Sequence, residues 1–375
     1  MKLQVNVKEE KREVEVDLDS FREPIELILQ EGRNDLAYRL LKALKDLQGK
    51  RSWVDDRLGS LYRKWIPRWH FEMLNDSHRG SAFGDALAKV DLRDKAVLDI
   101  GTGSGILSML AVRCGARHVY ACEMVEALAD KAQEIVRRNG MAHKITIIPK
   151  SSFAIEIGKD MPERAEVMLS ETIDCGFVGE GFLSTLRYAK AKLLKPHALL
   201  VPCGVHLLGA LVESPSIHQL NHVDSSHGFD VSEMNEFSTR GYFGVRLRNR
   251  PHRIVSEVQA MIDVDLYDEV PAKISRVVEF EALENATVHG VVFWFKIALA
   301  PGVSLSNDPD RPDCHWTQAF ATFSEPLAVQ KRGRYPLELT FSDHAVSIAP
   351  VEQLRLRHIS GVNRTGSREK IWNAV

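Results

Sequence analysis

The sequence lacks several features that would place the protein outside the cytoplasm. Its five cysteines, at positions 114, 122, 175, 203 and 314, form no C-x-x-C pair, which argues against a disulfide framework and against a zinc site. The longest apolar stretch, 198–212, contains Pro202, Gly204 and His206, and a membrane-spanning helix needs about 20 apolar residues. The charged run at 8–13 stands where a signal peptide would be apolar. We therefore expect a cytoplasmic protein without a membrane partner.

An excess of charge of one sign is also missing. Lys and Arg number 49 and Asp and Glu 51, so the formal net charge is -2 and no general attraction to nucleic acid is expected. The Asn-Pro-Pro-Tyr and Asp-Pro-Pro-Tyr elements of enzymes that methylate base amino groups are absent as well. The 375 residues are 44% hydrophobic and 27% charged, which is typical of a globular protein of two domains or one large domain.

Three regions differ in their hydrophobic pattern. Residues 1–18 alternate polar and apolar, which predicts a short strand pair or an appended edge strand, and 20–66 repeat leucine and isoleucine at helical spacing. From residue 95, strand-like runs at 96–100, 118–123, 144–149, 166–171 and 199–202 alternate with helix-length segments, which predicts a parallel sheet covered by helices. After Pro202, short strand-like runs separated by turns predict a β-sandwich or β-barrel. The polar stretch 214–253 interrupts this last region and is too long for an ordinary loop.

The most specific local motif is Asp99-x-Gly101-x-Gly103-x-Gly105, which joins an apolar strand to an apolar helix. Glycines in such a turn let a ligand approach the backbone at the start of a helix. The dinucleotide fingerprint G-x-G-x-x-G is not matched, because Ile106 stands where its third glycine would be. Glu123 ends the next strand, where its carboxylate can accept both hydroxyls of a ribose. These features favour a nucleoside ligand.

This block resembles the S-adenosylmethionine site of class I methyltransferases. The resemblance implies that Asp99 and the backbone of Gly101, Gly103 and Gly105 hold the amino-acid end of the cofactor and that Glu123 holds the ribose. The resemblance also makes Ser152 the expected polar contact near the adenine, where Phe153 stands beside it. The product would be S-adenosylhomocysteine.

Further motifs in the same order resemble the protein arginine methyltransferases. The segment 70–79 is similar to the helix that these enzymes lay over the cofactor, which implies Arg79 on the methionine carboxylate and Met73 beside the sulfonium. The segment 170–180 is similar to their double-glutamate loop, with Glu171 and Glu180 nine residues apart. Cys314-His315-Trp316 resembles their threonine-histidine-tryptophan loop, and 228–232 resembles part of their dimerisation arm.

The resemblance implies three domains: a mainly helical N-terminal extension at 1–66, a Rossmann-like domain that binds S-adenosylmethionine at 67–203, and a β-barrel substrate domain at 204–375. The arm, about 214–253, would be inserted in the barrel and would form a homodimer, so that deleting 216–246 should cost both dimerisation and activity.

The chemistry of arginine gives an independent reason for paired carboxylates. A guanidinium has a pKa of about 13 and a rigid plane of donors, so a site for it needs acceptors such as Glu171 and Glu180. Two carboxylates can draw positive charge away from the nitrogen that attacks the methyl group. The resemblance places His315 and Asp76 beside them as a pair that moves the proton, with Trp316 also at the substrate.

Some features depart from the family pattern. Cys314 stands where threonine is usual, and an aromatic pair of the N-terminal helix has no clear counterpart, the nearest aromatics being Tyr62, Trp65 and Trp69. Outside these motifs, His218 and His222 are one helical turn apart, but no third ligand follows at a suitable spacing, so no metal is expected.

Several functions therefore remain open. The favoured one is methylation of arginine, slightly more in its free form than in a peptide, because the near-neutral charge gives no docking surface for a basic tail, no added recognition domain is visible and residues 1–66 could close over a small substrate. A catalytically silent, cofactor-binding partner subunit is an alternative, which the presence of both glutamates disfavours. A methyltransferase for a small-molecule hydroxyl or amine is another.

Overall fold

The structure is a computed structural model that describes residues 2–7, 10–15, 17–47, 53–311 and 314–351. Their contacts separate two compact units. One contains the described residues up to 70 together with 125–128, and the other contains the described residues of 71–124 and 129–351. The predicted boundaries at 66/67 and 203/204 stay predictions, and the end of the predicted third domain, 352–375, lies outside the described residues.

The first unit contains the predicted strand pair and helices. β1 (Lys2–Val7) and β2 (Glu10–Glu15) pair antiparallel. Three helices follow: α1 (Arg22–Gln30), α2 (Asn34–Leu47) and α3 (Trp53–Trp65). Each buries one apolar face, as the leucine and isoleucine spacing predicts, and the shared core includes Ile25, Leu41 and Leu58.

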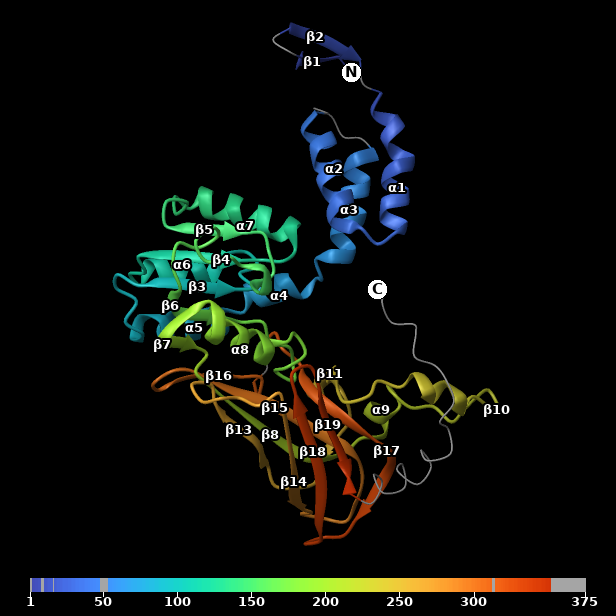
Figure 1. The fold of residues 1–375 in the computed structure, drawn as a ribbon. Coiled ribbons are helices and arrows are strands. Elements are labelled where there is room, and N and C mark those ends of the chain that lie inside the picture. Colours follow the sequence, from blue (N-terminus) through green and yellow to red (C-terminus); the bar gives the residue numbers. More distant parts are fainter. Residues whose placement is uncertain (1, 8–9, 16, 48–52, 312–313, 352–375) are drawn as a thin grey trace. The chain divides into compact units, whose positions relative to one another are not determined.

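The second unit begins with a parallel sheet and its covering helices. After α4 (Trp69–Asn75) and α5 (Ser77–Lys89), whose labels appear in Figure 1, the strands lie in the order β5-β4-β3-β6-β7 with parallel pairing throughout. The bounds of these strands are β3 Ala96–Ile100, β4 His118–Cys122, β5 Ile145–Ile148, β6 Ala165–Ser170 and β7 Leu194–Val201. The helices between them are α6 (Ile106–Arg113), α7 (Glu126–Arg138) and α8 (Phe182–Lys192). The predicted Rossmann-like arrangement is confirmed.

Antiparallel sheets make up the rest of this unit. One sheet joins β11-β17-β15-β8-β12, with β13 also on β8 and β16 also on β15, and a second joins β14-β18-β19. The bounds are β8 Gly204–Glu213, β11 Phe243–Val245, β12 Arg253–Ile254, β13 Gln259–Asp265, β14 Lys273–Glu281, β15 Ala286–Ala300, β16 Val303–Ser306, β17 Gln318–Val329, β18 Arg334–Ser342 and β19 Val346–Pro350. Within the described residues these strands do not close into a barrel, so the predicted barrel is corrected to barrel-like sheets.

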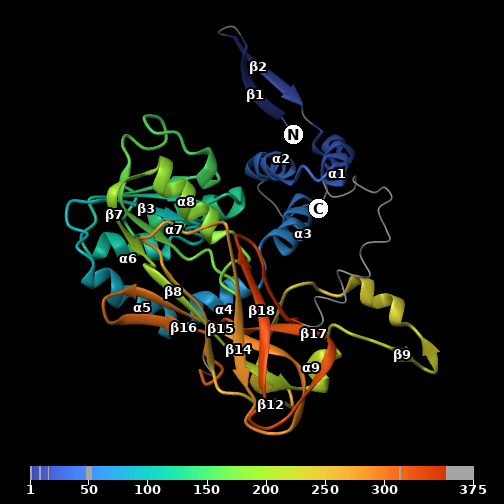
Figure 2. The same cartoon turned by 60° about the horizontal axis from the view of Figure 1, so that its bottom comes forward.

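The arm predicted at 214–253 is an extension rather than a structureless loop. It contains the short helix α9 (Pro215–His218), a two-residue strand pair of β9 (Ser225–Ser226) and β10 (Phe229–Asp230), and a 3-10 helix at Ser232–Phe237. In Figure 2 the strand β9 lies at the tip of a yellow extension that leaves the sheets. The chain returns to the sheet at β11.

Candidate functional site

The predicted site residues gather where the order of the parallel strands reverses. The chain runs from β3 outward through β4 and β5, then returns to place β6 on the other side of β3. Ile100, the last residue of β3, pairs with Ser170, the last residue of β6. The glycine motif and the loop of Glu171 therefore leave the sheet side by side, at the carboxyl-end crevice where open α/β sheets bind ligands.

The glycines of the motif are required by the backbone. Gly101, Gly103 and Gly105 have φ values of +73°, +54° and +81°, in the left-handed region that side chains disfavour. A Cβ at position 101 would also lie 2.3 Å from Thr172 Cγ2, in the neighbouring loop. Only glycine lets these two loops approach so closely.

Asp99 is held inside the turn with one oxygen left over. Its Oδ2 accepts hydrogen bonds from the Thr102 and Ser108 hydroxyls at 2.7 and 2.6 Å, while Oδ1 is buried without a partner. Burial raises the pKa of Asp99 to about 6, although these hydroxyls oppose the shift. A buried oxygen of this kind needs a donor, and a ligand amine would supply one.

The other residues predicted at the cofactor lie on neighbouring elements. The Gly103 amide donates to Glu123 Oε2 at 3.1 Å, so the acid at the end of β4 is joined to the glycine turn. Ser152 is buried, whereas the Phe153 side chain beside it is 49% exposed. Met73 is half-buried on α4.

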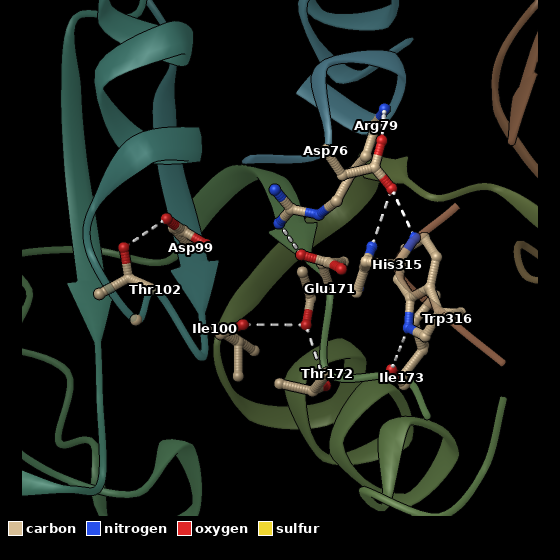
Figure 3. Close-up of polar contacts among 12 residues, drawn as sticks. Asp76, Arg79, Asp99, Ile100, Thr102, Glu171, Thr172, Ile173, His315 and Trp316 are labelled. Carbon is tan, nitrogen blue, oxygen red and sulfur yellow. Dashed lines mark hydrogen bonds and ion pairs between the residues drawn. The ribbon is translucent and has the colours of Figure 1, made fainter. Parts of the chain in front are cut away.

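Arg79 is a buried cation paired with Glu171 (Figure 3). Both side chains are nearly inaccessible, at 4% and 6% exposed, and the Arg79 Nη2 group donates to Glu171 Oε2. Burial lowers the pKa of Arg79 to about 10, with Asp76 and Asp99 acting in the opposite direction, so the guanidinium stays charged at neutral pH. Arg79 Nε is buried without a partner and is free to bind a further anion.

Asp76 joins the start of α5 to the loop of His315. As the N-cap of α5, its Oδ1 accepts the Arg79 amide at 2.8 Å, and its Oδ2 accepts both the amide and the Nδ1–H of His315 at 3.0 Å. Burial alone would raise the pKa of Asp76, but these hydrogen bonds outweigh it and the pKa is lowered. Burial lowers the pKa of His315, so its ring is neutral at pH 7 with the proton on Nδ1 and a lone pair on Nε2.

Trp316 and Glu180 have different surroundings from the buried pair. The Trp316 indole donates to the Ile173 carbonyl at 3.1 Å, so it holds the double-glutamate loop by its backbone. Glu180 as a whole residue is exposed, but neighbouring protein groups partly shield its carboxyl from solvent. This partial burial, together with the charges of Asp174 and Glu123, raises the pKa of Glu180 to about 7. The structure thus joins Glu171 to Arg79, and Asp76 to His315, while no hydrogen bond joins Glu180 to them in the described residues.

Three further residues of the site are not among those predicted from the sequence. Thr102 and Ser108 orient Asp99, and Asn307 donates to the carbonyls of Cys175 and Thr317 at 3.0 and 2.7 Å. Only the hydroxyls near the glycine motif could have been suspected from the sequence, because Asn307 lies far along the chain in the antiparallel region.

The residues present fit S-adenosylmethionine. The unpartnered Asp99 Oδ1 and Arg79 Nε suit an amine and a carboxylate, the two groups of its amino-acid end. Glu123 directly follows β4 and accepts the Gly103 amide, so its carboxylate lies at the glycine turn and could accept the hydroxyls of a ribose. No group of three or more His, Cys, Asp and Glu side chains in the described part of the chain could hold a metal ion. None of the described helices has the length and apolar character needed to cross a membrane.

Comparison with protein families finds two matches. Residues 207–348 match the arginine methyltransferase oligomerization subdomain, and 84–170 match the ribosomal protein L11 methyltransferase family. An arginine N(omega)-methyltransferase of Streptomyces achromogenes subsp. streptozoticus is 38% identical over 78% of this chain and 81% of its own length. Protein arginine N-methyltransferase 9 of Mus musculus is 28% identical over 84% of this chain, which spans 42% of that protein.

Solved structures share the fold. The Trypanosoma brucei PRMT1 enzyme-prozyme heterotetrameric complex with AdoHcy aligns with a TM-score of 0.64 and 27% identity, covering 72% of this chain and 86% of that chain. Arabidopsis thaliana protein arginine methyltransferase 10, crystallised in an open conformation, aligns with a TM-score of 0.60 and 23% identity over the same shares.

Replacing Asp76 by alanine should destabilise the second unit. The change removes the α5 cap and leaves buried donors of His315 unpaired, so we expect the free energy of unfolding to fall by about 2–4 kcal/mol at pH 7. Because the pKa of Asp76 is lowered in the folded protein, the loss should shrink as the pH falls below the ordinary value of 3.8. Denaturant titration followed by circular dichroism would measure both effects. Ser151→Ala, which removes an exposed 3-10 helix cap, is the control, and an equal loss in both variants would contradict the prediction.

Proposed function

The chain belongs to the arginine N-methyltransferase family of S-adenosylmethionine-dependent enzymes, and from this premise we propose that it methylates a guanidino nitrogen of free L-arginine. The observation that carries the proposal is the buried carboxylate of Glu171, which lies beside the cofactor motif and already binds one guanidinium, that of Arg79. A site that pairs with one guanidinium has the chemistry for another.

The choice of free arginine is supported by the relatives. The Streptomyces relative, at 38% identity, is named for arginine alone, whereas the relatives named for protein or histone arginine are 26–30% identical. The near-neutral net charge of -2 is consistent with a small substrate, because it provides no strongly acidic surface on which a basic, arginine-rich tail could dock. Peptidyl-arginine is the second candidate, supported by the larger number of relatives so named.

In the proposed reaction, two carboxylates bind the substrate. S-adenosylmethionine, when bound, supplies a methyl group made electrophilic by a sulfonium. Arg79 occupies Glu171 Oε2, so Oε1 and the carboxylate of Glu180 would receive the guanidinium in a fork. Two negative charges on one side of the cation draw its positive charge toward them and leave electron density on the nitrogen that faces the methyl group.

His315 would take the proton that the guanidino nitrogen loses. Its Nδ1–H is held by Asp76, which leaves Nε2 as the basic nitrogen. Its lowered pKa keeps the ring neutral and able to accept, and the Asp76 carboxylate stabilises the imidazolium once it forms. The proton can be lost after methyl transfer, so positioning by the carboxylates contributes more than base strength.

A second copy of this chain would complete the assembly. The match to an oligomerization subdomain indicates that this region associates, and the arm exposes large apolar side chains, including Phe229 at 72% and Phe237 at 79%. We propose that the arm forms a homodimer. A cytoplasmic location and the absence of nucleic-acid and membrane partners stay predictions from the sequence.

The substrate is tested by turnover. Incubation with labelled S-adenosylmethionine should methylate free L-arginine with a kcat/KM at least about tenfold above that for an arginine-glycine-rich peptide, because a tenfold preference needs only about 1.4 kcal/mol of discrimination. Transfer to the peptide alone would establish the second candidate. Cofactor binding without transfer to either would contradict the proposal and favour the silent subunit or another nucleophile.

The pH dependence should identify Glu180. A carboxyl with a pKa of about 7 is protonated in acid and then loses its attraction for the guanidinium, so kcat/KM should fall about tenfold per unit below pH 7 and be flat above it. Glu180→Gln should lower kcat/KM by about 10- to 100-fold at pH 8. It should also abolish the fall of kcat/KM below pH 7, which is the acid limb of the pH profile. The substrate guanidinium does not titrate in this range, and His315 titrates lower. An unchanged limb in the variant would exclude Glu180 as its source.

The arm is tested by changing exposed residues only. Phe229→Ser combined with Phe237→Ser should convert the dimer to a monomer, because burial of two phenylalanines contributes about 3–6 kcal/mol to association. Analytical ultracentrifugation measures the change. Tyr267→Ser, an exposed aromatic outside the arm, is the control, and a dimer that survives the double change refutes the docking role.

A further inference from the structure

The two loops of the proposed site meet the same short strand, β11. We propose that two residues at the end of the arm are positioning residues: Tyr242, which precedes β11, and Arg246, which follows it. Together they fix the position of the Glu171–Glu180 loop relative to the His315 loop. The inference rests on the proposed function, because it assigns the two loops to binding arginine and moving its proton.

Tyr242 holds the first loop through Asp174. Its hydroxyl donates to Asp174 Oδ2 at 2.7 Å, and Asp174 Oδ1 accepts the amides of Gly176 and Gly179 at 3.2 and 2.8 Å. A Cβ at Gly176 would lie 2.4 Å from the Tyr242 ring, so the ring packs directly on the loop backbone. Burial and the charge of Asp174 raise the pKa of Tyr242, which keeps the hydroxyl protonated and able to donate.

This contact reaches Glu180 in two ways. Gly179, whose amide Asp174 binds, precedes Glu180 directly, so Asp174 sets the backbone from which Glu180 extends. Asp174 also lies close enough to raise the pKa of Glu180 by charge repulsion. The hydrogen bond from Tyr242 withdraws part of that charge, and its loss would strengthen the repulsion.

Arg246 holds the second loop by its backbone. Its Nη1 and Nη2 groups donate to the carbonyls of Cys314 and His315 at 2.8 and 3.0 Å, a fork that matches two successive peptide oxygens. Asp76 binds the amide and ring of the same histidine from α5. His315 is therefore held from two elements, one of which is the end of the arm.

β11 is suited to connect these contacts. Its three residues pair antiparallel with Phe320, Ala319 and Gln318 of β17. The approach at Gly244 is close, since a Cβ there would lie 2.6 Å from Thr317 Oγ1. Tyr242 and Arg246 are four residues apart, about 13 Å along an extended strand, which is enough to serve two separate loops from one rigid element.

The hydroxyl of Tyr242 is tested by Tyr242→Phe and Asp174→Asn. Tyr242→Phe keeps the ring on Gly176, so dimerisation and S-adenosylhomocysteine affinity should be unchanged, while kcat/KM for arginine falls by about 10- to 100-fold. The acid limb of this variant should move to higher pH by about half a unit, because Asp174 loses the hydrogen bond that withdraws part of its charge and then repels the Glu180 carboxylate more strongly. Asp174→Asn keeps the shape but removes the charge, so the limb should move down. Opposite shifts are not expected of a merely structural contact.

Arg246→Ala should lower kcat by at least about tenfold and leave the position of the acid limb unchanged, because Arg246 acts on the His315 loop. Tyr267→Phe removes the part-buried acceptor of the Leu200 amide, and Arg253→Ala removes an exposed contact with Glu213. Both changes lie away from the two loops and serve as controls that should keep wild-type kinetics.

Two outcomes separate this inference from the proposed function. In the first outcome, wild-type protein methylates arginine and Glu180→Gln is impaired, but the variants at 242, 174 and 246 keep kcat and kcat/KM within twofold of their controls and an unshifted acid limb. That outcome refutes the positioning role. If wild-type protein does not methylate arginine, or Glu180→Gln is unimpaired, the proposed function fails instead. Should Tyr242→Phe fold poorly, the downward shift in Asp174→Asn still decides the role of the pair.

Discussion

The ion pair between Arg79 and Glu171 is the contact on which the site depends. A buried guanidinium is costly unless a carboxylate compensates it, and here the two groups come from α5 and from the loop after β6. Their attraction ties the helix that precedes the parallel sheet to the loop that carries the proposed substrate carboxylates. Arg79 Nε and Asp99 Oδ1 remain unpartnered, so the same cluster has a donor for a carboxylate and an acceptor for an amine, the two charged groups of an amino acid.

The parallel sheet explains why these groups meet. Pairing of Ile100 with Ser170 brings the ends of β3 and β6 together, and the hydroxyl of Ser170 donates to the Ile100 carbonyl at 2.9 Å. Gly101 and Thr172 then approach so closely that any other residue at 101 would separate the loops. The cofactor motif and the proposed substrate loop thus leave the sheet side by side, which suits a reaction that transfers a group between two bound molecules.

The antiparallel region does more than enlarge the core. It supplies His315 and Trp316 to the site, and the end of its arm supplies Tyr242 and Arg246, which bind both site loops through hydrogen bonds. If the arm forms the proposed homodimer, its contacts with these loops would give assembly a direct physical route to the chemistry. Such a connection would make the dimer the active form without requiring any residue of one subunit in the site of the other.

The sequence by itself determined the local features. The period of apolar residues predicted the N-terminal helices and the strands of the parallel and antiparallel regions, and the glycine motif predicted the cofactor, because turns, faces and short motifs depend on neighbours in the chain. The roles of Glu171 and Glu180 stay predictions from their motif. The tertiary structure alone decided that the sheets stay open in the described residues, that Glu171 pairs with Arg79, and that Tyr242, Arg246 and Asn307 support the loops. These contacts join residues that are 68 to 132 positions apart in the chain, and only packing determines which buried donor meets which acceptor.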